Sequence, residues 1–457
     1  MSPSSCHDLR RSAVVTGVAD LAPAPTVGRG SRLPAAVALV VLLVALGLVI
    51  GFTTPWRIID ASVPGGRAPT DPSLYYSAAV RAREDAFHAA IHPSSYAALF
   101  LGWAAVLLLG FTPAGARLAG RLGRGRWPLV AALGGAAVVV VAWLVQLPFE
   151  ARGHVVLRDY DLTLQGWGGW FADQGRSLGV SVVPVVIGVL AFYALVRRFP
   201  RTWWLPVSVA GAALVFLFSF LYPVVVEPVF NHFHPLPQGQ LRSDLLAMAR
   251  RDGVPVDDVL VADASRRTTT LNAYVSGYGG TRRIVLYDNL LRDVPPAQIE
   301  VIVAHELGHA KYDDVLHGTA IGALGVAAGL TAVFVLLSSP ALLRRGGVRS
   351  ARDPRSVALL VAVVTVLSTL SGPVQNLVSR QIEARADWHA LQLTNDPQAF
   401  VAAMRSLAIR GLSDLDPNGA QYVWFVTHPT SPQRLAMAVD WARLHGMPIP
   451  LPLPAAR

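Results

Sequence analysis

The chain has 457 residues, of which 53% are hydrophobic and only 15% are charged. A soluble protein carries about 25% charged residues, so the composition excludes an ordinary soluble globular protein. The formal net charge is +10, yet no basic, aromatic-rich motif accompanies it, and no nucleic-acid partner is expected. The single cysteine, Cys6, excludes an internal disulfide and a cysteine-based zinc site.

Residues 1–30 are rich in Ser, Pro and Gly and are predicted to form a disordered tail. Apolar runs of about 20 residues follow, the length that a helix needs to cross about 30 Å of hydrocarbon. Seven spans are predicted, at about residues 33–53, 96–113, 128–149, 178–197, 203–226, 316–339 and 356–378. The chain is therefore predicted to be a multi-pass protein of the cell membrane, with the lipid bilayer as a partner.

Three short loops carry arginines and indicate an orientation. These loops lie between the second and third spans, after the fourth span, and between the sixth and seventh spans. Their arginines are Arg117, Arg121, Arg124 and Arg126, then Arg197, Arg198 and Arg201, then Arg344, Arg345, Arg349, Arg352 and Arg355. Seven spans place all three loops on one side, which the positive-inside rule makes cytoplasmic. The polar segments 227–315 and 379–457 are then expected on the extracytoplasmic side.

Segment 227–315 is a polar island among the spans. DLLAMARRDGVPVDDVLVAD predicts an amphipathic helix, a turn and a short strand. TTTLNAYVSGYGGTRRIVLYDNLL predicts a hairpin of two strands around its glycines. After Pro295 and Pro296, which suit a helix start, AQIEVIVAHELGHAKY shows helical spacing.

The HELGH motif places two histidines and a glutamate in five residues of this helix. His305 and His309 are four apart, so they share a helix face and both imidazoles can bind one ion. Catalytic zinc sites use three protein ligands and leave one position open. Glu306, beside the first histidine, can act as the base that takes a proton from water.

The third ligand must come from elsewhere in the chain. Glu383, in SRQIEARADWHA, is the only glutamate after Glu306, and Asp387 lies one turn further, where it can hold a ligand histidine through the second ring nitrogen. An arginine-paired surface helix is the alternative for these two acids. Other candidate ligands are His317, His389 and His428.

Several sequence blocks carry a resemblance to a known family. They are LTLQGWGGWFADQ, EPVFNHFHPLP, ASRRTTTLNAYVSGYGGTRRIVLYDNLL, AHELGH, SRQIEARAD and HPTSPQR, in this order over about residues 150–440. The sequence resembles the type 1 CAAX prenyl proteases, membrane zinc metallopeptidases of the gluzincin class. The resemblance implies that seven helices surround an intramembrane chamber and that the zinc site faces it. Polar residues such as Gln146 and Glu150 agree with a wet cavity.

The resemblance also implies roles for single residues. It implies His305, His309 and Glu383 as zinc ligands, Glu306 as the catalytic base, and Asp387 as a partner of a ligand. A strand containing Asn272, Ala273 and Tyr274 would border the cleft and bind an extended peptide through its edge; core packing of Tyr274 is the alternative. His428 and Arg434 would stabilise an oxyanion or bind a peptide carboxylate; the alternative is a helix N-terminal turn.

The predicted fold is an α-helical polytopic membrane protein of about seven transmembrane helices that form a chamber, with a small α+β gluzincin zinc-protease domain. The expected parts are the tail 1–30, five membrane helices in 31–226, the protease domain in 227–315, two membrane helices in 316–378, and a C-terminal helical part in 379–457 that carries the third ligand.

The predicted function is a membrane-embedded zinc metalloendopeptidase with one Zn²⁺ per chain, similar to CAAX prenyl proteases. Its substrate would be a peptide or protein, lipidated or inserted in the membrane. Two alternatives are a broad quality-control protease of membrane proteins and a non-catalytic zinc-binding protein or transporter. The resemblance implies a cytosolic catalytic domain in eukaryotes, whereas the arginine loops favour the extracytoplasmic side.

Overall fold

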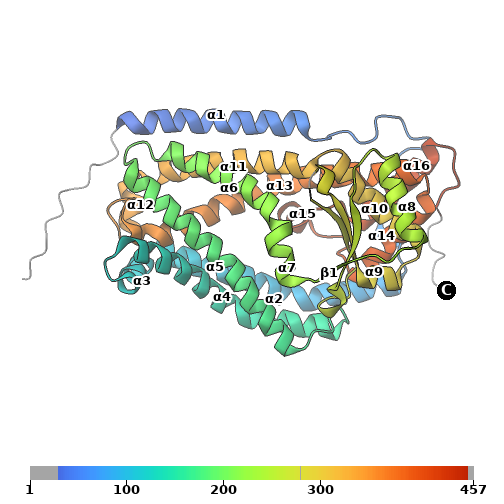
Figure 1. Ribbon diagram of the computed structural model, residues 1–457, viewed down its shortest axis with the longest axis horizontal. Coiled ribbons are helices and arrows are strands. Elements are labelled where there is room, and N and C mark those ends of the chain that lie inside the picture. Colours follow the sequence, from blue (N-terminus) through green and yellow to red (C-terminus); the bar gives the residue numbers. More distant parts are fainter. Residues whose placement is uncertain (1–28, 278, 451–457) are drawn as a thin grey trace, which may run out of the picture.

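The computed structural model describes residues 29–277 and 279–450. The tail predicted for residues 1–30 lies outside this range, apart from its last two residues, which begin helix α1. In Figure 1 the long helices run along the length of the molecule, and a small sheet with short helices gathers at the end opposite α3 and α12.

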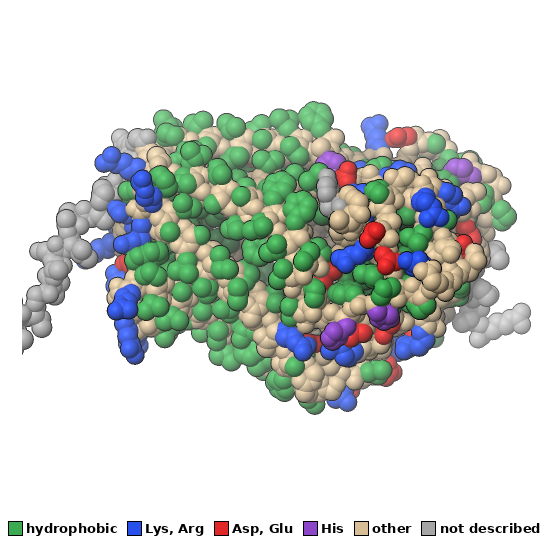
Figure 2. Space-filling view, viewed as in Figure 1, with side chains coloured by type: hydrophobic (Ala, Val, Ile, Leu, Met, Phe, Trp, Pro, Cys, Tyr) green, Lys and Arg blue, Asp and Glu red, His purple; other side chains and the backbone are tan. Residues whose placement is uncertain are grey.

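Seven helical segments in the described part of the chain are long and apolar enough to cross a membrane. The helices that form them are α1 (Arg29–Thr53), α2 (Ala78–Gly110), α4 (Trp127–Asp159), α5 (Trp167–Arg198), α6 (Trp204–Leu221) with its continuation, α11 (Asp314–Leu337) and α13 (Val357–Thr394). Figure 2 shows a broad hydrophobic surface over the helical part of the molecule, which suits contact with lipid. The predicted fold class and the seven spans are confirmed.

Shorter elements complete the chain. The helices are η1 (Pro72–Leu74), α3 (Pro113–Gly123), η2 (Tyr222–Val226), α7 (Glu227–Phe230), α8 (Gln240–Arg251), η3 (Ala264–Arg266), η4 (Gly279–Thr281), α9 (Asp288–Asp293), α10 (Pro296–Lys311), α12 (Pro340–Arg345), η5 (Pro354–Ser356), α14 (Pro397–Gly411), α15 (Gly419–Trp424) and α16 (Ser431–Leu444). The strands are β1 (Phe233–Pro235), β2 (Asp258–Ala262), β3 (Ala273–Ser276) and β4 (Arg283–Tyr287). Because α13 is continuous, the domain boundary expected after residue 378 falls inside one helix.

The four strands form one sheet in the order β1-β2-β4-β3. Strands β2 and β4 are parallel, whereas β1 pairs antiparallel with β2 and β3 pairs antiparallel with β4. Tyr274 stands opposite Val285 in the β3–β4 pair, which is the hairpin expected around the glycines. Strand β3 lies at the edge of the sheet, so one side of its backbone pairs with no other strand in the described part of the chain.

Helix α10 lies in the core of the protease part. Pro295 and Pro296 start the helix, since proline at the first helical position needs no backbone N–H. Val301, Val303 and Leu307 are completely buried in a core that α8, α14, α16 and the sheet also build. The helix that carries the HELGH motif is therefore held on several sides.

Helix α10 packs closely against α13 at Gly308. A Cβ atom at Gly308 would lie 3.1 Å from His389 Cδ2 and 3.3 Å from Ala386 Cα. These separations are tighter than ordinary van der Waals contact, so glycine at this position permits the close approach of the two helices. The approach matters for the site because His305 and His309 flank Gly308 on α10, and Glu383 lies on the facing helix.

A cavity of about 550 Å³ lies among the membrane helices α2, α4, α5 and α13. Gln146 and Glu150 of α4 and Gln174 of α5 line it beside apolar residues, and the Trp143 indole N–H donates a hydrogen bond to Gln174 Oε1 (3.2 Å). Gly102 leaves room for the Gln146 side chain. Polar side chains at membrane depth are costly against lipid, and here they face this space instead.

We expect Gly308→Ala to destabilise the protein relative to Gly318→Ala, a matched change on α11 where a Cβ atom would meet nothing within 4 Å. Both changes gain about 1 kcal/mol of helix propensity, so their difference isolates the crowding against α13. Overpacking of this kind costs about 1–3 kcal/mol. Thermal unfolding of the two purified variants in detergent measures the difference, and equal Tm values would contradict the close-packing argument.

Candidate metal centre

Three side chains from two helices converge on one point. His305 Nε2 lies 3.2 Å from His309 Nε2 and 3.2 Å from Glu383 Oε2. His309 Nε2 lies 3.7 Å from the same carboxylate oxygen. The three atoms thus form a nearly equilateral triangle, although Glu383 lies 78 positions after His305 in the chain.

The triangle has the dimensions of a zinc site. Zinc bonds of about 2.0–2.1 Å in tetrahedral geometry place neighbouring ligand atoms about 3.3–3.4 Å apart. Two imidazole nitrogens and one carboxylate oxygen also match the donor set of catalytic zinc, which leaves a fourth position open. The residues present therefore fit a catalytic zinc ion.

A buried carboxylate orients the first histidine. Asp387 Oδ1 lies 2.9 Å from His305 Nδ1, and the Asp387 side chain is completely buried. Arg434 of α16 holds this carboxylate with two hydrogen bonds, from Nε at 2.8 Å and from Nη2 at 2.5 Å. A hydrogen bond at Nδ1 fixes the tautomer that leaves Nε2 free to bind metal. Asp387 and Arg434 thus set the direction of the His305 ring.

A second carboxylate, Asp314, does the same for the other histidine. Asp314 Oδ2 lies 2.9 Å from His309 Nδ1, and the other oxygen of Asp314 accepts a hydrogen bond from Arg385. The Arg385 guanidinium in turn lies over the Tyr312 ring, 4.4 Å from its centroid. Asp314 was not predicted from the sequence. The sequence feature that could have indicated it is the pair Asp313-Asp314, which follows soon after α10 ends at Lys311. A chain that turns back after a helix end can bring such a residue to the last turn, here to His309.

Glu306 points its carboxylate into a cavity of about 320 Å³ that His309 and Glu383 also line. Within the described residues, no hydrogen bond or ion pair engages this carboxylate, so it is available to a water molecule or substrate. Burial raises the pKa of the Glu306 carboxyl above its usual value. A carboxylate with a raised pKa is a stronger proton acceptor, which suits general-base chemistry.

The sequence offers three further histidines as candidate ligands: His317, His389 and His428. Of these, only His428 lies beside the three ligand atoms. His428 Nε2 lies 3.3 Å from Glu383 Oε2, with 56% of the side chain exposed. His389 instead contacts Asp252 (2.9 Å), which also accepts from Lys311 Nζ (2.6 Å). His317 is bonded through Nδ1 to the Tyr312 carbonyl, away from the triangle.

Strand β3 reaches the cavity with its C-terminal end. Val275 and Gly277 line the space that contains Glu306. The residues proposed for substrate binding lie just before them, with Asn272 exposed, Ala273 buried and Tyr274 half-buried. The Tyr274 hydroxyl donates to Glu227 Oε2 (3.3 Å), and burial raises the pKa of this phenol above its usual value.

Comparison with known proteins identifies the family. Peptidase family M48 matches residues 235–442, and the CAAX prenyl protease N-terminal region of five membrane helices matches residues 89–232. A metalloprotease of Bacillus subtilis, YhfN, is 32% identical over 301 residues, covering 65% of this chain and 71% of its own. The chain belongs to peptidase family M48. It is a membrane zinc metalloprotease of the CAAX prenyl protease type.

Other relatives of this M48 peptidase agree. CAAX prenyl protease 1 of Saccharomyces cerevisiae is 28% identical over 326 residues, covering 65% of this chain and 69% of its own. The crystal structure of S. mikatae Ste24p superimposes with a TM-score of 0.69 at 20% identity, covering 89% of this chain and 98% of the other. The structural match shows that the fold extends over the membrane helices and the protease part together.

We expect Asp314→Asn to weaken zinc binding by about 10- to 100-fold, because His309 loses the carboxylate that orients its ring. Asp313→Asn is the matched control. Asp313 is the neighbouring residue, pairs with Arg282 (2.7 Å) and has a positive φ of 51°, a backbone conformation that asparagine tolerates. Zinc affinity is measured by competition with a chromogenic chelator. Equal affinities of the two variants would remove Asp314 from the metal centre.

Proposed function

We propose that this M48 peptidase is a membrane metalloendopeptidase with His305, His309 and Glu383 as ligands of one catalytic zinc ion. The observation that carries the proposal is the triangle of 3.2, 3.2 and 3.7 Å among the three ligand atoms. When bound, a zinc ion at this site supplies Lewis-acid polarisation of a carbonyl and lowers the pKa of a water molecule.

Glu306 performs the proton transfers in this proposal. Its carboxylate faces the cavity beside two of the ligands and has no protein partner in the described part of the chain. It accepts a proton from the attacking water and later donates that proton to the leaving amine, which keeps the charges at the site balanced. The raised pKa of the Glu306 carboxyl favours the first of these transfers.

The remaining residues position the reacting groups. Asp387 and Asp314 hold the two ligand rings, and Arg434 neutralises the buried charge of Asp387. Arg434 donates to Asp387 through both Nε and Nη2, which favours a positioning role over direct contact with substrate. We infer that His428 contacts the oxyanion, a role that its half-exposed ring 3.3 Å from Glu383 supports.

The substrate is proposed to be an extended peptide attached to a lipid or a membrane segment. The unpaired side of β3 can add a peptide strand by backbone hydrogen bonds, and Val275 and Gly277 at the end of β3 lead into the cavity of Glu306. Leu316 of α11 and Glu383 of α13, two of the helices long and apolar enough to cross a membrane, line this cavity, which supports a substrate presented at the membrane. Membership in a peptidase family removes the transporter alternative, while a broad quality-control protease remains the second candidate.

The test is cleavage of one peptide in farnesylated and bare form. We expect Glu306→Gln to retain zinc and lower the cleavage rate by about 10²- to 10⁴-fold, the size of a general-base contribution. Glu300→Gln, on the same helix but away from the cavity, is the matched control with wild-type rate. Full activity of Glu306→Gln would reject the base assignment. Preference for the farnesylated peptide supports a prenyl-protein substrate, and equal cleavage supports the broad protease.

For the orientation, we propose that the protease part lies on the extracytoplasmic side. Arg117, Arg121, Arg197 and Arg355, from the three arginine loops, line one common cavity. In Figure 2 arginines gather at the end of the molecule opposite the mixed charges of the protease part. One concentrated basic end is the signal to which the positive-inside rule refers.

A reporter fused after the C-terminus measures the orientation. We expect alkaline phosphatase, which folds only outside the cytoplasm, to be active in this fusion, and green fluorescent protein, exported by the general secretory route, to be dark. A fusion at the loop between α5 and α6, on the arginine side, should show the reverse pattern. The opposite pair of results would place the protease part in the cytoplasm and overturn the charge argument.

A further inference from the structure

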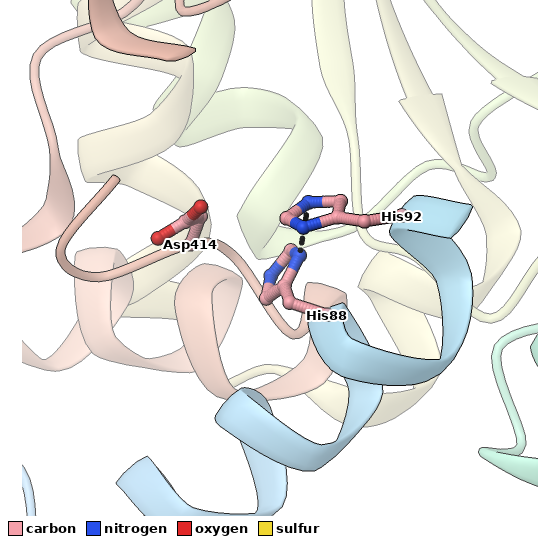
Figure 3. Close-up of side chains that lie close together, drawn as sticks. All are labelled: His88, His92 and Asp414. Carbon is pink, nitrogen blue, oxygen red and sulfur yellow. Dashed lines mark hydrogen bonds between the residues drawn. The ribbon is translucent and has the colours of Figure 1, made fainter. Parts of the chain in front are cut away.

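A second group of metal-binding side chains lies away from the catalytic triangle. His88 and His92 are four residues apart on α2, and Asp414 lies in the connection between α14 and α15. Figure 3 shows the two rings and the carboxylate turned toward one another. Their candidate ligand atoms all lie within 4.8 Å of one another. The two histidines precede Pro93, on a stretch of α2 that also carries Arg81, Arg83, Glu84 and Asp85, so the group lies at the polar end of this helix.

The hydrogen bonds of His88 determine which of its nitrogens is free. His88 Nε2 lies 2.9 Å from the Leu412 carbonyl oxygen, which can only accept, so Nε2 carries the proton. In the neutral ring Nδ1 then has a lone pair. A histidine whose second nitrogen donates to a carbonyl is the arrangement found in metal ligands. His88 is thus prepared to offer Nδ1.

His92 presents a lone pair to the same point. Its Nε2 lies 3.2 Å from Gln421 Nε2, an amide nitrogen that can only donate. The orientation of this amide is set at its other end, where Gln421 Oε1 accepts from Asn418 Nδ2 (2.6 Å) and from the Asn418 backbone N–H (3.3 Å). His92 Nε2 therefore accepts, and carries no proton of its own.

His88 Nδ1 and His92 Nε2 are thus two unprotonated nitrogens only 3.1 Å apart, and the single lone pair of His92 Nε2 can turn from the Gln421 amide to a cation between the rings. Such a contact between acceptors is repulsive unless a proton or a metal cation lies between them. The separation is close to the edge of about 3.3 Å between ligands of tetrahedral zinc. The Asp414 carboxylate, which also accepts from the Asp416 backbone N–H (3.2 Å), supplies negative charge and a third donor.

We propose that His88, His92 and Asp414 form a second metal site, which takes a divalent transition metal of the zinc class through two imidazole nitrogens and a carboxylate. Carboxylate and imidazole donors together suit zinc better than calcium or magnesium, which prefer oxygen alone. One ion per chain was predicted from the sequence, and this site makes the number two. The inference rests on residues separate from the catalytic triangle and does not depend on the proposed function.

A metal here links the membrane bundle to the segment that carries His428. Asp414 leads into α15, and two side chains of α13 already bind the far end of that helix: Arg380 donates to the Tyr422 and Val426 carbonyls (2.9 and 2.6 Å), and Asn376 donates to the Val423 carbonyl (3.2 Å). The second site would fix the near end of α15 to α2. The role is therefore structural, and it holds the loop before His428 in place.

The test is the number of zinc ions bound by the purified full chain in detergent, after equilibrium dialysis against micromolar free zinc. We expect about two equivalents for the wild type and about one for His92→Gln and for Asp414→Asn, since each removes a ligand. His234→Ala, which removes an exposed histidine of β1, is the matched control and should keep two. Glu383→Gln should lose the catalytic equivalent and keep the second.

Saturation of the wild type at one equivalent would overturn the proposal without any variant, and it would indicate that a proton separates the two rings. Two equivalents that persist in both ligand variants would overturn it as well. A variant that has lost its fold loses the catalytic equivalent too, so it is recognised by the absence of all metal. If Glu383→Gln keeps two equivalents, the catalytic ligand set fails while the second site stands.

Discussion

The close crossing of α10 and α13 is the constraint on which the rest of the site depends. Gly308 lies between the two histidines of HELGH, and a Cβ atom there would crowd Ala386 and His389. At this separation a carboxylate on α13 reaches the nitrogens on α10 at 3.2 and 3.7 Å. The candidate metal centre is thus a consequence of helix packing. Gly308, the small residue inside the motif, permits this packing.

Buried charges around this crossing occur in compensated sets. Asp387 is held by Arg434 and His305, Asp314 by Arg385 and His309, and Asp252 by Lys311 and His389. An unpaired carboxylate at these depths would cost several kcal/mol, whereas each acid here meets a cation and an imidazole. In a chain with few acids, those that surround α10 serve to orient histidines. The one carboxylate beside the ligands that lacks a protein partner in the described residues is Glu306, which the proposed reaction uses.

The membrane part and the protease part are joined by shared helices. Helix α13 begins among the membrane helices and ends in the protease core, with Glu383 in its last third. Helix α2 also belongs to both parts: its first half carries His88 and His92, and His88 contacts Leu412, which follows α14 in the chain. The two proposed metal sites therefore lie where long helices leave the apolar bundle. This placement couples the position of the catalytic residues to the packing of the spans.

The sequence by itself determined the local properties of this protein. Apolar runs of helical length specify the spans, and helical spacing puts His305 and His309 on one face, because both depend on residues close together in the chain. The scarcity of glutamates and the spacing of one helical turn pointed to Glu383 and Asp387 with a surface helix as the alternative, and the resemblance of sequence blocks implied the same two residues. Tertiary structure alone decided which distant groups meet: that Asp314 turns back onto His309, that Arg434 is taken up by Asp387, and that Asp414 approaches α2. These contacts depend on how the helices pack and where the connections between them end. Neither can be read from the hydrophobic periodicity or the motif spacing of the sequence.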